Sequence, residues 1–188
     1  MEQLLNFFDE NEVRATFFVV GEIVESWKGQ LGELAEQGHE IGLHGFTHRY
    51  LRDLGPSLTR HELDLGLKVL RECLGIENPG FRAPYHSLSP DTPWVPSILL
   101  DHGVSYSSSV MPSFNPIGGY PGAPRRPFLW ECGLLELPAP VWGLGPLALP
   151  LLGGAYLRLA PAPLVHLASR GRSADSGDWL YSHPYDFD

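Results

Sequence analysis

Apolar residues in the first half of the chain recur with the spacings of short helices and short strands. Side chains that return every three or four positions predict three helices, over residues 2–10, 22–37 and 57–74. Gly38 follows the second helix as a glycine typical of a helix end, and Ser57 is suited to cap the third. The runs at residues 15–20 and 40–43 are short and apolar, which is typical of buried strands.

The second half continues this alternation but contains more turns. No proline occurs in the first 55 residues, whereas eleven of the 18 prolines fall between positions 112 and 163. The pattern predicts one more helix, over residues 94–102, and four strands, over residues 80–82, 104–108, 134–137 and 179–182. Short strands that alternate with amphipathic helices predict an α/β fold with a parallel sheet, either open or closed into a barrel.

Composition and charge narrow the range of partners. Thirteen Lys and Arg against 22 Asp and Glu give a formal net charge of −9, which argues against a nucleic-acid partner. The most apolar stretch, residues 144–164, is interrupted by four prolines and a charged residue, so we expect no integral membrane segment. The amino terminus lacks the features of a signal peptide, and two cysteines are too few for a disulfide framework.

Two histidines four positions apart, His44 and His48, follow the predicted strand at residues 40–43. Imidazoles at this spacing lie on one face of a helical turn and can chelate one divalent metal ion. Such a pair also arises by chance, so the evidence for a metal site is the position of the pair directly after a predicted strand. Active sites of parallel α/β folds lie at the carboxyl ends of the strands, and we therefore expect a metal site here.

Two other predicted strand ends carry polar residues. Arg82 ends the strand at residues 80–82, and Pro84 stiffens the backbone that leads to Tyr85. An arginine here can orient a carboxylate, and a backbone N–H at Tyr85 can face an oxyanion. His183 follows the last predicted strand and suits a general acid. Each residue taken alone is better explained by a structural role, whereas three strand ends together predict a catalytic site.

In chain order, four stretches resemble the polysaccharide deacetylase family, the NodB-homology group of carbohydrate esterases. They are residues 13–21 (VRATFFVVG), 38–48 (GHEIGLHGFTH), 80–85 (GFRAPY) and 181–186 (YSHPYD). The second half also resembles a subgroup found near exopolysaccharide loci. That likeness rests on residues 136–138 (ELP), 153–156 (GGAY) and the closing His-Pro-aromatic-acidic motif.

The resemblance implies a distorted, incomplete (β/α) barrel and a metal-dependent hydrolase that removes acetyl groups from N-acetylated sugars of a polysaccharide. His44 and His48 match the two histidine ligands of a divalent metal ion, for which zinc is the expected identity. Arg82 matches the arginine that orients the catalytic base. The backbone amide of Tyr85 matches the oxyanion donor, and His183 matches the general acid that protonates the leaving amine.

The chain departs from the family pattern in two places. The family's first strand ends in paired acidic residues, which supply the base and a third metal ligand, and no counterpart precedes residue 15. We therefore expect residues 1–188 to be a single domain without its first strand, truncated at both ends and inactive as given. Residues 106–109 read Tyr-Ser-Ser-Ser where relatives in the subgroup carry Tyr-Asp-Ser-Ser.

Two alternative functions stay open. A degenerate member of the family would bind a glycan without hydrolysing it, and five tryptophans and seven tyrosines are available for sugar contacts. A metal hydrolase of the same fold would instead act on a small cyclic or linear amide. The sequence does not identify the sugar, the metal ion, the oligomeric state or the compartment.

Overall fold

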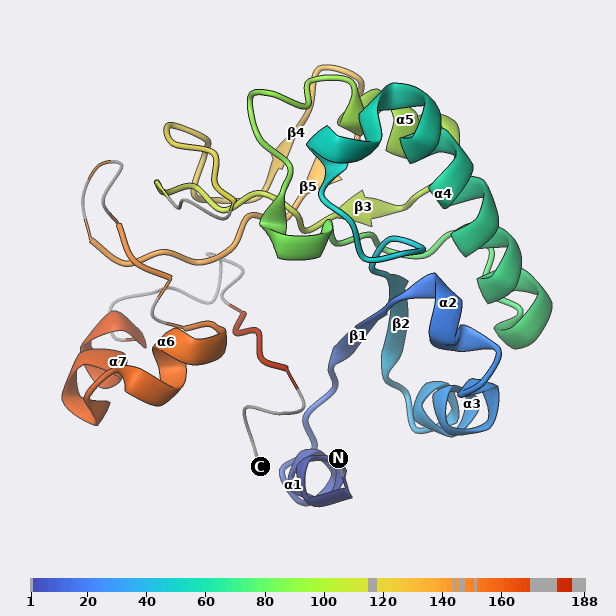
Figure 1. The fold of residues 1–188 in the computed structure, drawn as a ribbon. Coiled ribbons are helices and arrows are strands. Elements are labelled where there is room, and N and C mark those ends of the chain that lie inside the picture. Colours follow the sequence, from blue (N-terminus) through green and yellow to red (C-terminus); the bar gives the residue numbers. More distant parts are fainter. Residues whose placement is uncertain are drawn as a thin grey trace.

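The computed structural model describes residues 2–114, 118–143, 145, 148–150, 152–169 and 179–183. Helices and strands alternate in the first half, and the second half consists of short strands, loops and two small helices (Figure 1). In chain order the elements are α1 (Glu2–Glu10), β1 (Thr16–Val19), α2 (Gly21–Val24), α3 (Lys28–Glu36), β2 (Glu40–Leu43), α4 (Leu51–Leu74), the 3-10 helix η1 (Pro84–His86), α5 (Val95–Asp101), β3 (Tyr106–Ser107), β4 (Phe128–Leu129), β5 (Leu135–Glu136), α6 (Gly154–Leu159) and α7 (Ala162–Ser169).

The strands form one row that is parallel except at its last member. β1 pairs with β2 in parallel, and Phe81 then bridges Leu43 on one side and Ser107 of β3 on the other. β3 pairs in parallel with β5, and antiparallel β4 ends the row. This order confirms the predicted α/β class with a parallel sheet. The described strands form an open row, and closure into a barrel is not confirmed.

Several predicted elements differ in extent from the observed ones. The predicted helix at 22–37 is split into α2 and α3, and Trp27 is exposed between them. α4 spans Leu51–Leu74, but Gly55, with φ 63° and ψ 179°, divides it into a short first segment and a long second segment that starts at Pro56, next to the predicted start at residue 57. The predicted strands at 80–82 and 179–182 are reduced to single bridges, at Phe81 and Tyr181.

β1 is less buried than its apolar sequence predicted. Thr16, Phe17 and Phe18 are half-buried, and only Val19 is fully buried. β1 lies at the end of the row, so only one of its edges pairs with another described strand. The expectation of a strand buried on both faces was therefore wrong for β1, whereas Ile41, Gly42 and Leu43 of β2 are buried as expected.

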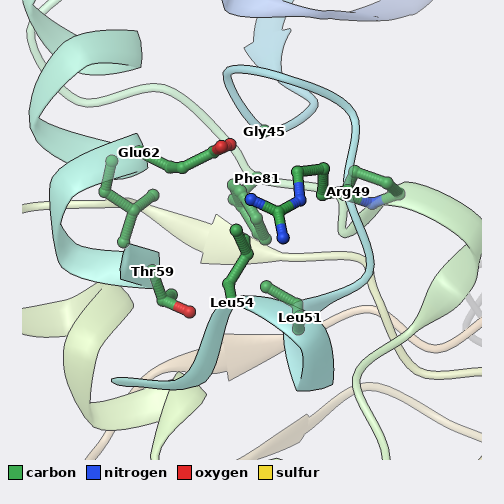
Figure 2. Close-up of a pocket in the computed structure, with 9 residues that line it drawn as sticks. Gly45, Arg49, Leu51, Leu54, Thr59, Glu62 and Phe81 are labelled. Carbon is green, nitrogen blue, oxygen red and sulfur yellow. The ribbon is translucent and has the colours of Figure 1, made fainter. Parts of the chain in front are cut away.

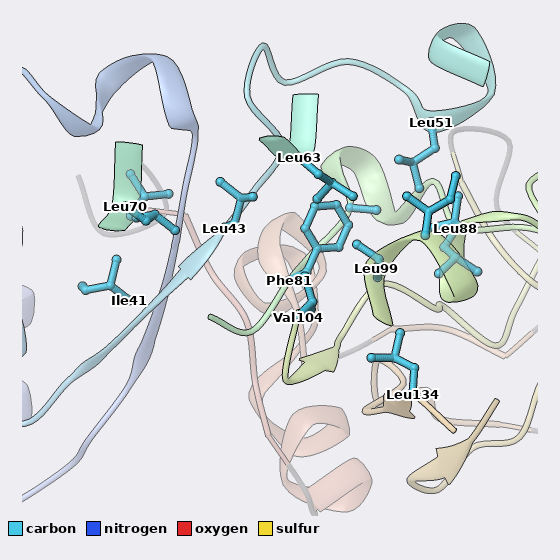
Figure 3. Packing of buried hydrophobic residues seen from close by; sticks show 14 of the residues in the cluster. Ile41, Leu43, Leu51, Leu63, Leu70, Phe81, Leu88, Leu99, Val104 and Leu134 are labelled. Atoms are coloured by element: carbon cyan, nitrogen blue, oxygen red, sulfur yellow. The ribbon is translucent and has the colours of Figure 1, made fainter. Parts of the chain in front are cut away.

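The main core lies between the sheet and the helices α4 and α5 (Figures 1 and 3). Phe81 lies at its centre, next to Leu63 of α4 and Leu99 of α5 in the close-up. Gly66 allows α4 to approach β2 closely, because a Cβ at this position would lie 2.7 Å from Cδ1 of Leu43. Within the part of the chain that the structure describes, no helix is both long enough and apolar enough to cross a membrane.

We expect Leu99→Ala to destabilise the protein by about 2–5 kcal/mol, because it removes a side chain that is 0% exposed and leaves a cavity in this core. Leu100→Ala is the matched control, since its side chain is 40% exposed one position further along α5. Urea unfolding of both variants measures the difference. Equal losses of the free energy of unfolding would contradict the position of the core.

Candidate active site

Three neighbouring segments of the sheet deliver polar residues to the same edge. The His44 N–H donates to the carbonyl of Val19 at 2.8 Å, and the Arg82 N–H donates to the carbonyl of Leu43 at 2.9 Å. The Ser108 N–H donates to the carbonyl of Phe81 at 2.8 Å. Because these strands are parallel, His44, Arg82 and Ser108 all follow carboxyl ends, where the sequence predicted the site.

The two predicted metal-binding histidines lie side by side. The ring centroids of His44 and His48 are 5.0 Å apart, with 63° between the ring planes. The prediction that the pair lies on a helical turn was wrong, because residues 44–48 form a loop between β2 and α4. Gly45 with φ 71° and His48 with φ 55° reverse the chain and bring the imidazoles together.

A hydrogen bond orients the ring of His44. Its Nδ1 lies 2.7 Å from the carbonyl oxygen of Arg82, and since a carbonyl only accepts, Nδ1 carries the proton. Nε2 then has the free lone pair that a metal ion requires, an arrangement typical of metal-binding histidines. Burial lowers the pKa of His44 to about 4. Burial, and then the charge of His183, lower the pKa of His48, so both rings are neutral near pH 7.

Arg82 is held by the strand next to it. Nε donates to the carbonyl of Ser108 at 3.0 Å, and Nη2 donates to the Ser108 hydroxyl at 2.9 Å. The guanidinium also lies over the rings of Phe18 and Trp179, with Cζ at 4.3 and 4.4 Å from their centroids. Burial lowers the pKa of Arg82 to about 10, which leaves it charged at neutral pH. Among the described residues, none of the ion pairs includes Arg82.

Tyr85 lies beside the histidine pair with an uncommon backbone. Its φ is 59° and that of His86 is 50°, so two successive residues other than glycine are left-handed. Such conformations are costly and gather at functional sites. The ring of Tyr85 lies between Tyr50, stacked at 4.2 Å, and His48, at 4.7 Å. Ala83 is extended, as is typical of the residue before a proline.

His183 approaches the pair from the end of the described chain. A parallel bridge joins Tyr181 to Gly153, and a Cβ on Gly154 would lie 3.8 Å from Cε1 of His183. An electrostatic interaction with His183 is among the causes that lower the pKa values of His44 and His48. Residues 184–186 of the closing motif lie outside the described residues. The structure therefore brings together all five predicted site residues: His44, His48, Arg82, Tyr85 and His183.

Two buried carboxylates next to these residues were not recognised as part of the site from the sequence. Glu136 is completely buried, and its Oε1 accepts the N–H groups of Ser109 and Val110 at 2.7 and 2.8 Å. Glu62 of α4 accepts two N–H groups from the loop that carries the histidines. The only signal for Glu136 was its place in the Glu-Leu-Pro stretch, and Glu62 gave none.

The histidine pair fits a divalent metal ion as two of its ligands. Neutral imidazoles are common zinc ligands, and the fixed Nδ1 proton on His44 directs one lone pair away from the backbone. Within the described residues, no group of three or more His, Cys, Asp or Glu side chains is arranged to hold a metal ion. The described part of the chain therefore provides a two-histidine half-site.

Comparisons with known proteins identify the family of this chain. The family model described as "Polysaccharide deacetylase" matches residues 1–105, and one described as "Domain of unknown function (DUF3473)" matches residues 108–188. The first covers more than half of the chain, so this protein belongs to the polysaccharide deacetylase family. The membership inferred from the four sequence stretches is thereby confirmed.

The relatives are larger than this chain. It is 28% identical over 109 residues to a peptidoglycan deacetylase of Helicobacter pylori, which covers 58% of this chain and 36% of that protein. It is 34% identical over 82 residues to chitin deacetylase 1 of Cryptococcus neoformans var. grubii, which covers 44% of this chain and 17% of that protein. The chain thus spans about a third or less of these two relatives.

A solved structure extends the likeness into the second half. The crystal structure of a Mycobacterium smegmatis protein classed with the polysaccharide deacetylases matches with a TM-score of 0.60 and 30% identity. The match covers 73% of this chain and 44% of that one. Because the first family model ends at residue 105, a coverage of 73% includes part of the second half as well.

His86, which was not among the predicted site residues, is buried beside the site. It has a backbone hydrogen bond with Ser109, its ring contacts Tyr181 at 5.0 Å, and Nδ1 has no hydrogen-bond partner among the described residues. Burial is the largest cause that lowers the pKa of His86, to about 3, followed by the charge of Arg82. The folded protein therefore keeps His86 neutral well below pH 6.5.

This makes His86 a source of acid sensitivity. The unfolded chain binds a proton there near pH 6.5, whereas the folded protein does not until about pH 3. The free energy of unfolding should therefore fall as the pH drops below 6.5, by about 1.4 kcal/mol per pH unit for this one proton. His86→Gln should reduce that slope, as measured by urea unfolding between pH 7 and pH 4. An unchanged slope would show that His86 is not held neutral.

Proposed function

We propose that this chain carries the histidine and arginine side of the active site of a metal-dependent hydrolase that removes acetyl groups from N-acetylated sugars of a polysaccharide. The observation that carries the proposal is the pair His44 and His48, fixed side by side next to Arg82 on a chain of the polysaccharide deacetylase family. The relatives named for peptidoglycan and chitin support a polysaccharide substrate built from N-acetylated sugars.

Each proposed role rests on a feature of its residue. His44 and His48 would hold a divalent ion, with zinc as the proposed identity, because both are neutral and adjacent. When bound, such an ion polarises the acetyl carbonyl and lowers the pKa of a water molecule towards neutrality. Arg82, anchored on Ser108 and charged, would orient the carboxylate that acts as the base.

The remaining two roles complete the hydrolysis. The N–H of Tyr85, held by the ring contacts to Tyr50 and His48, would donate to the oxygen that becomes negative as water attacks. His183 would donate a proton to the sugar nitrogen as the C–N bond breaks, so that the products are acetate and the free amine. We further propose that residues 1–188 alone turn over substrate slowly or not at all, because the described residues bring no carboxylate to the histidine pair.

We also propose that residues 1–188 form a single domain belonging to an incomplete (β/α) barrel. The sheet supports this, because Phe81 joins β2 to β3, and β3 pairs with β5 from the second family-model segment. The core supports it as well, since Leu134 belongs to the same cluster as Leu43. The likeness to the Mycobacterium smegmatis structure, which covers 73% of this chain, supports a single domain that includes residues from both family-model segments.

The test measures zinc content and acetate release for the zinc-loaded chain. We expect about one zinc ion per chain, lost in the double variant His44→Ala, His48→Ala and retained in His61→Ala, an exposed histidine of α4. Released acetate is measured with oligomers of N-acetylglucosamine and with peptidoglycan, and any release should disappear with the double variant.

Other results would contradict parts of this proposal. Zinc retained by the double variant would exclude His44 and His48 as ligands. Binding of the oligomers by the metal-free chain, with no acetate released at any zinc concentration, would favour a glycan-binding protein. Release of acetate from small amides but from neither polysaccharide would change the substrate class.

A further inference from the structure

Glu62 is a buried carboxylate whose hydrogen-bond donors among the described residues all come from the loop that carries His44 and His48. Oε2 accepts the N–H groups of Phe46 and Thr47, both at 3.0 Å, and Oε1 accepts a short hydrogen bond from the Thr47 hydroxyl. The residue is only 8% exposed, and it is not part of any ion pair among the described residues. Its charge is therefore balanced by the loop itself.

The position of Glu62 on α4 makes it a fixed support. α4 is a long helix whose buried residues pack in the core, and Leu63, next to Glu62, is 2% exposed. In Figure 2 the carboxylate of Glu62 points towards Gly45 at the turn of the loop. A Cβ on Gly45 would lie 3.9 Å from Oε2 of Glu62, so the turn lies directly against the carboxylate.

The loop needs such a support because its own backbone does not form a regular element. Residues 44–48 are neither helix nor strand, and His48 has the left-handed φ of 55°. The two amides that Glu62 binds lie between the two histidines along the chain, so their position sets where His48 lies relative to His44. Backbone amides that lost this acceptor would be left unpaired at a partly buried site.

We infer that Glu62 is a positioning residue that fixes the His44–His48 loop in the geometry that binds a metal ion. The metal ion in this inference rests on the proposed function. The contact between Glu62 and the loop does not depend on that function. Groups that hold a metal ligand in place affect metal affinity 10–100-fold when they are removed. Glu62 acts through the backbone of the loop and has no contact with substrate in this account.

The test uses the full chain and three variants. Glu62→Ala removes the acceptor, whereas Glu62→Gln keeps an oxygen for the two N–H groups and an NH₂ that can donate to the Thr47 hydroxyl. Thr59→Ala is the matched control, because Thr59 is also buried one turn earlier in α4 and its hydroxyl donates to Gly55 rather than to the loop. Two readouts are taken: hydrogen exchange of the Phe46 and Thr47 amides without metal, and the Kd for Zn²⁺ alone.

In Glu62→Ala we expect both amides to exchange at least about 10-fold faster and Zn²⁺ to bind about 10–100-fold more weakly. Glu62→Gln and Thr59→Ala should stay close to the unmodified chain in both readouts. Unchanged exchange, or unchanged zinc affinity, in folded Glu62→Ala would overturn the inference. If Glu62→Ala does not fold, Glu62→Asp replaces it, since its shorter carboxylate is drawn back from the loop and should give smaller changes in the same direction.

The two readouts separate this inference from the proposed function. If the unmodified chain binds Zn²⁺ no better than the His44→Ala, His48→Ala variant, the proposed metal site is refuted. Hydrogen exchange then still decides whether Glu62 holds the loop. Weaker zinc binding in Thr59→Ala that matches Glu62→Ala would assign the effect to general loosening of α4 and would overturn the positioning role.

Discussion

The backbone pairing of Phe81 with β2 and β3 is the constraint on which the rest of the site depends. Leu43 donates to the carbonyl of Gly80 at 2.8 Å, and Phe81 donates to the carbonyl of Tyr106 at 2.9 Å. These parallel bonds set the ends of three segments beside one another, although the middle segment pairs through a single residue. The burial of the Phe81 ring in the core holds that residue in register. Without this pairing, the carbonyl oxygen of Arg82 would not lie where it accepts the hydrogen bond from the ring of His44.

Beyond the strand ends, the site is built from loops, and buried polar groups give those loops their shape. Glu62 accepts amides from the loop after β2, and Glu136 accepts amides from the segment after β3. A buried carboxylate without partners would be costly, whereas one that accepts several N–H groups fixes the segment that donates them. The same principle applies to Arg82, whose hydrogen bonds to Ser108 position a charged group that the sheet alone would leave mobile.

The sequence predicted the parts of the molecule that follow from local periodicity. β2 has the predicted bounds, and the five site residues were proposed because they lie at or near strand ends that buried runs indicate. The loop conformation was not predictable, since the left-handed φ of His48 depends on contacts with α4. Glu62 was missed because it lies among Arg60, His61 and Asp64, a charged stretch that is typical of a solvated helix face. Its burial arises only when the loop 15 or 16 residues earlier folds onto it.

The central claim is that the loop after β2 presents one nitrogen of each histidine to a shared metal ion. Anomalous diffraction at the zinc edge, on crystals of the zinc-loaded protein, tests it most directly. The account predicts zinc bound to Nε2 of His44, with His48 as a second ligand, while Nδ1 of His44 keeps its hydrogen bond to the Arg82 carbonyl. Zinc bound elsewhere on the chain, or held by Nδ1 of His44 with that hydrogen bond broken, would contradict it.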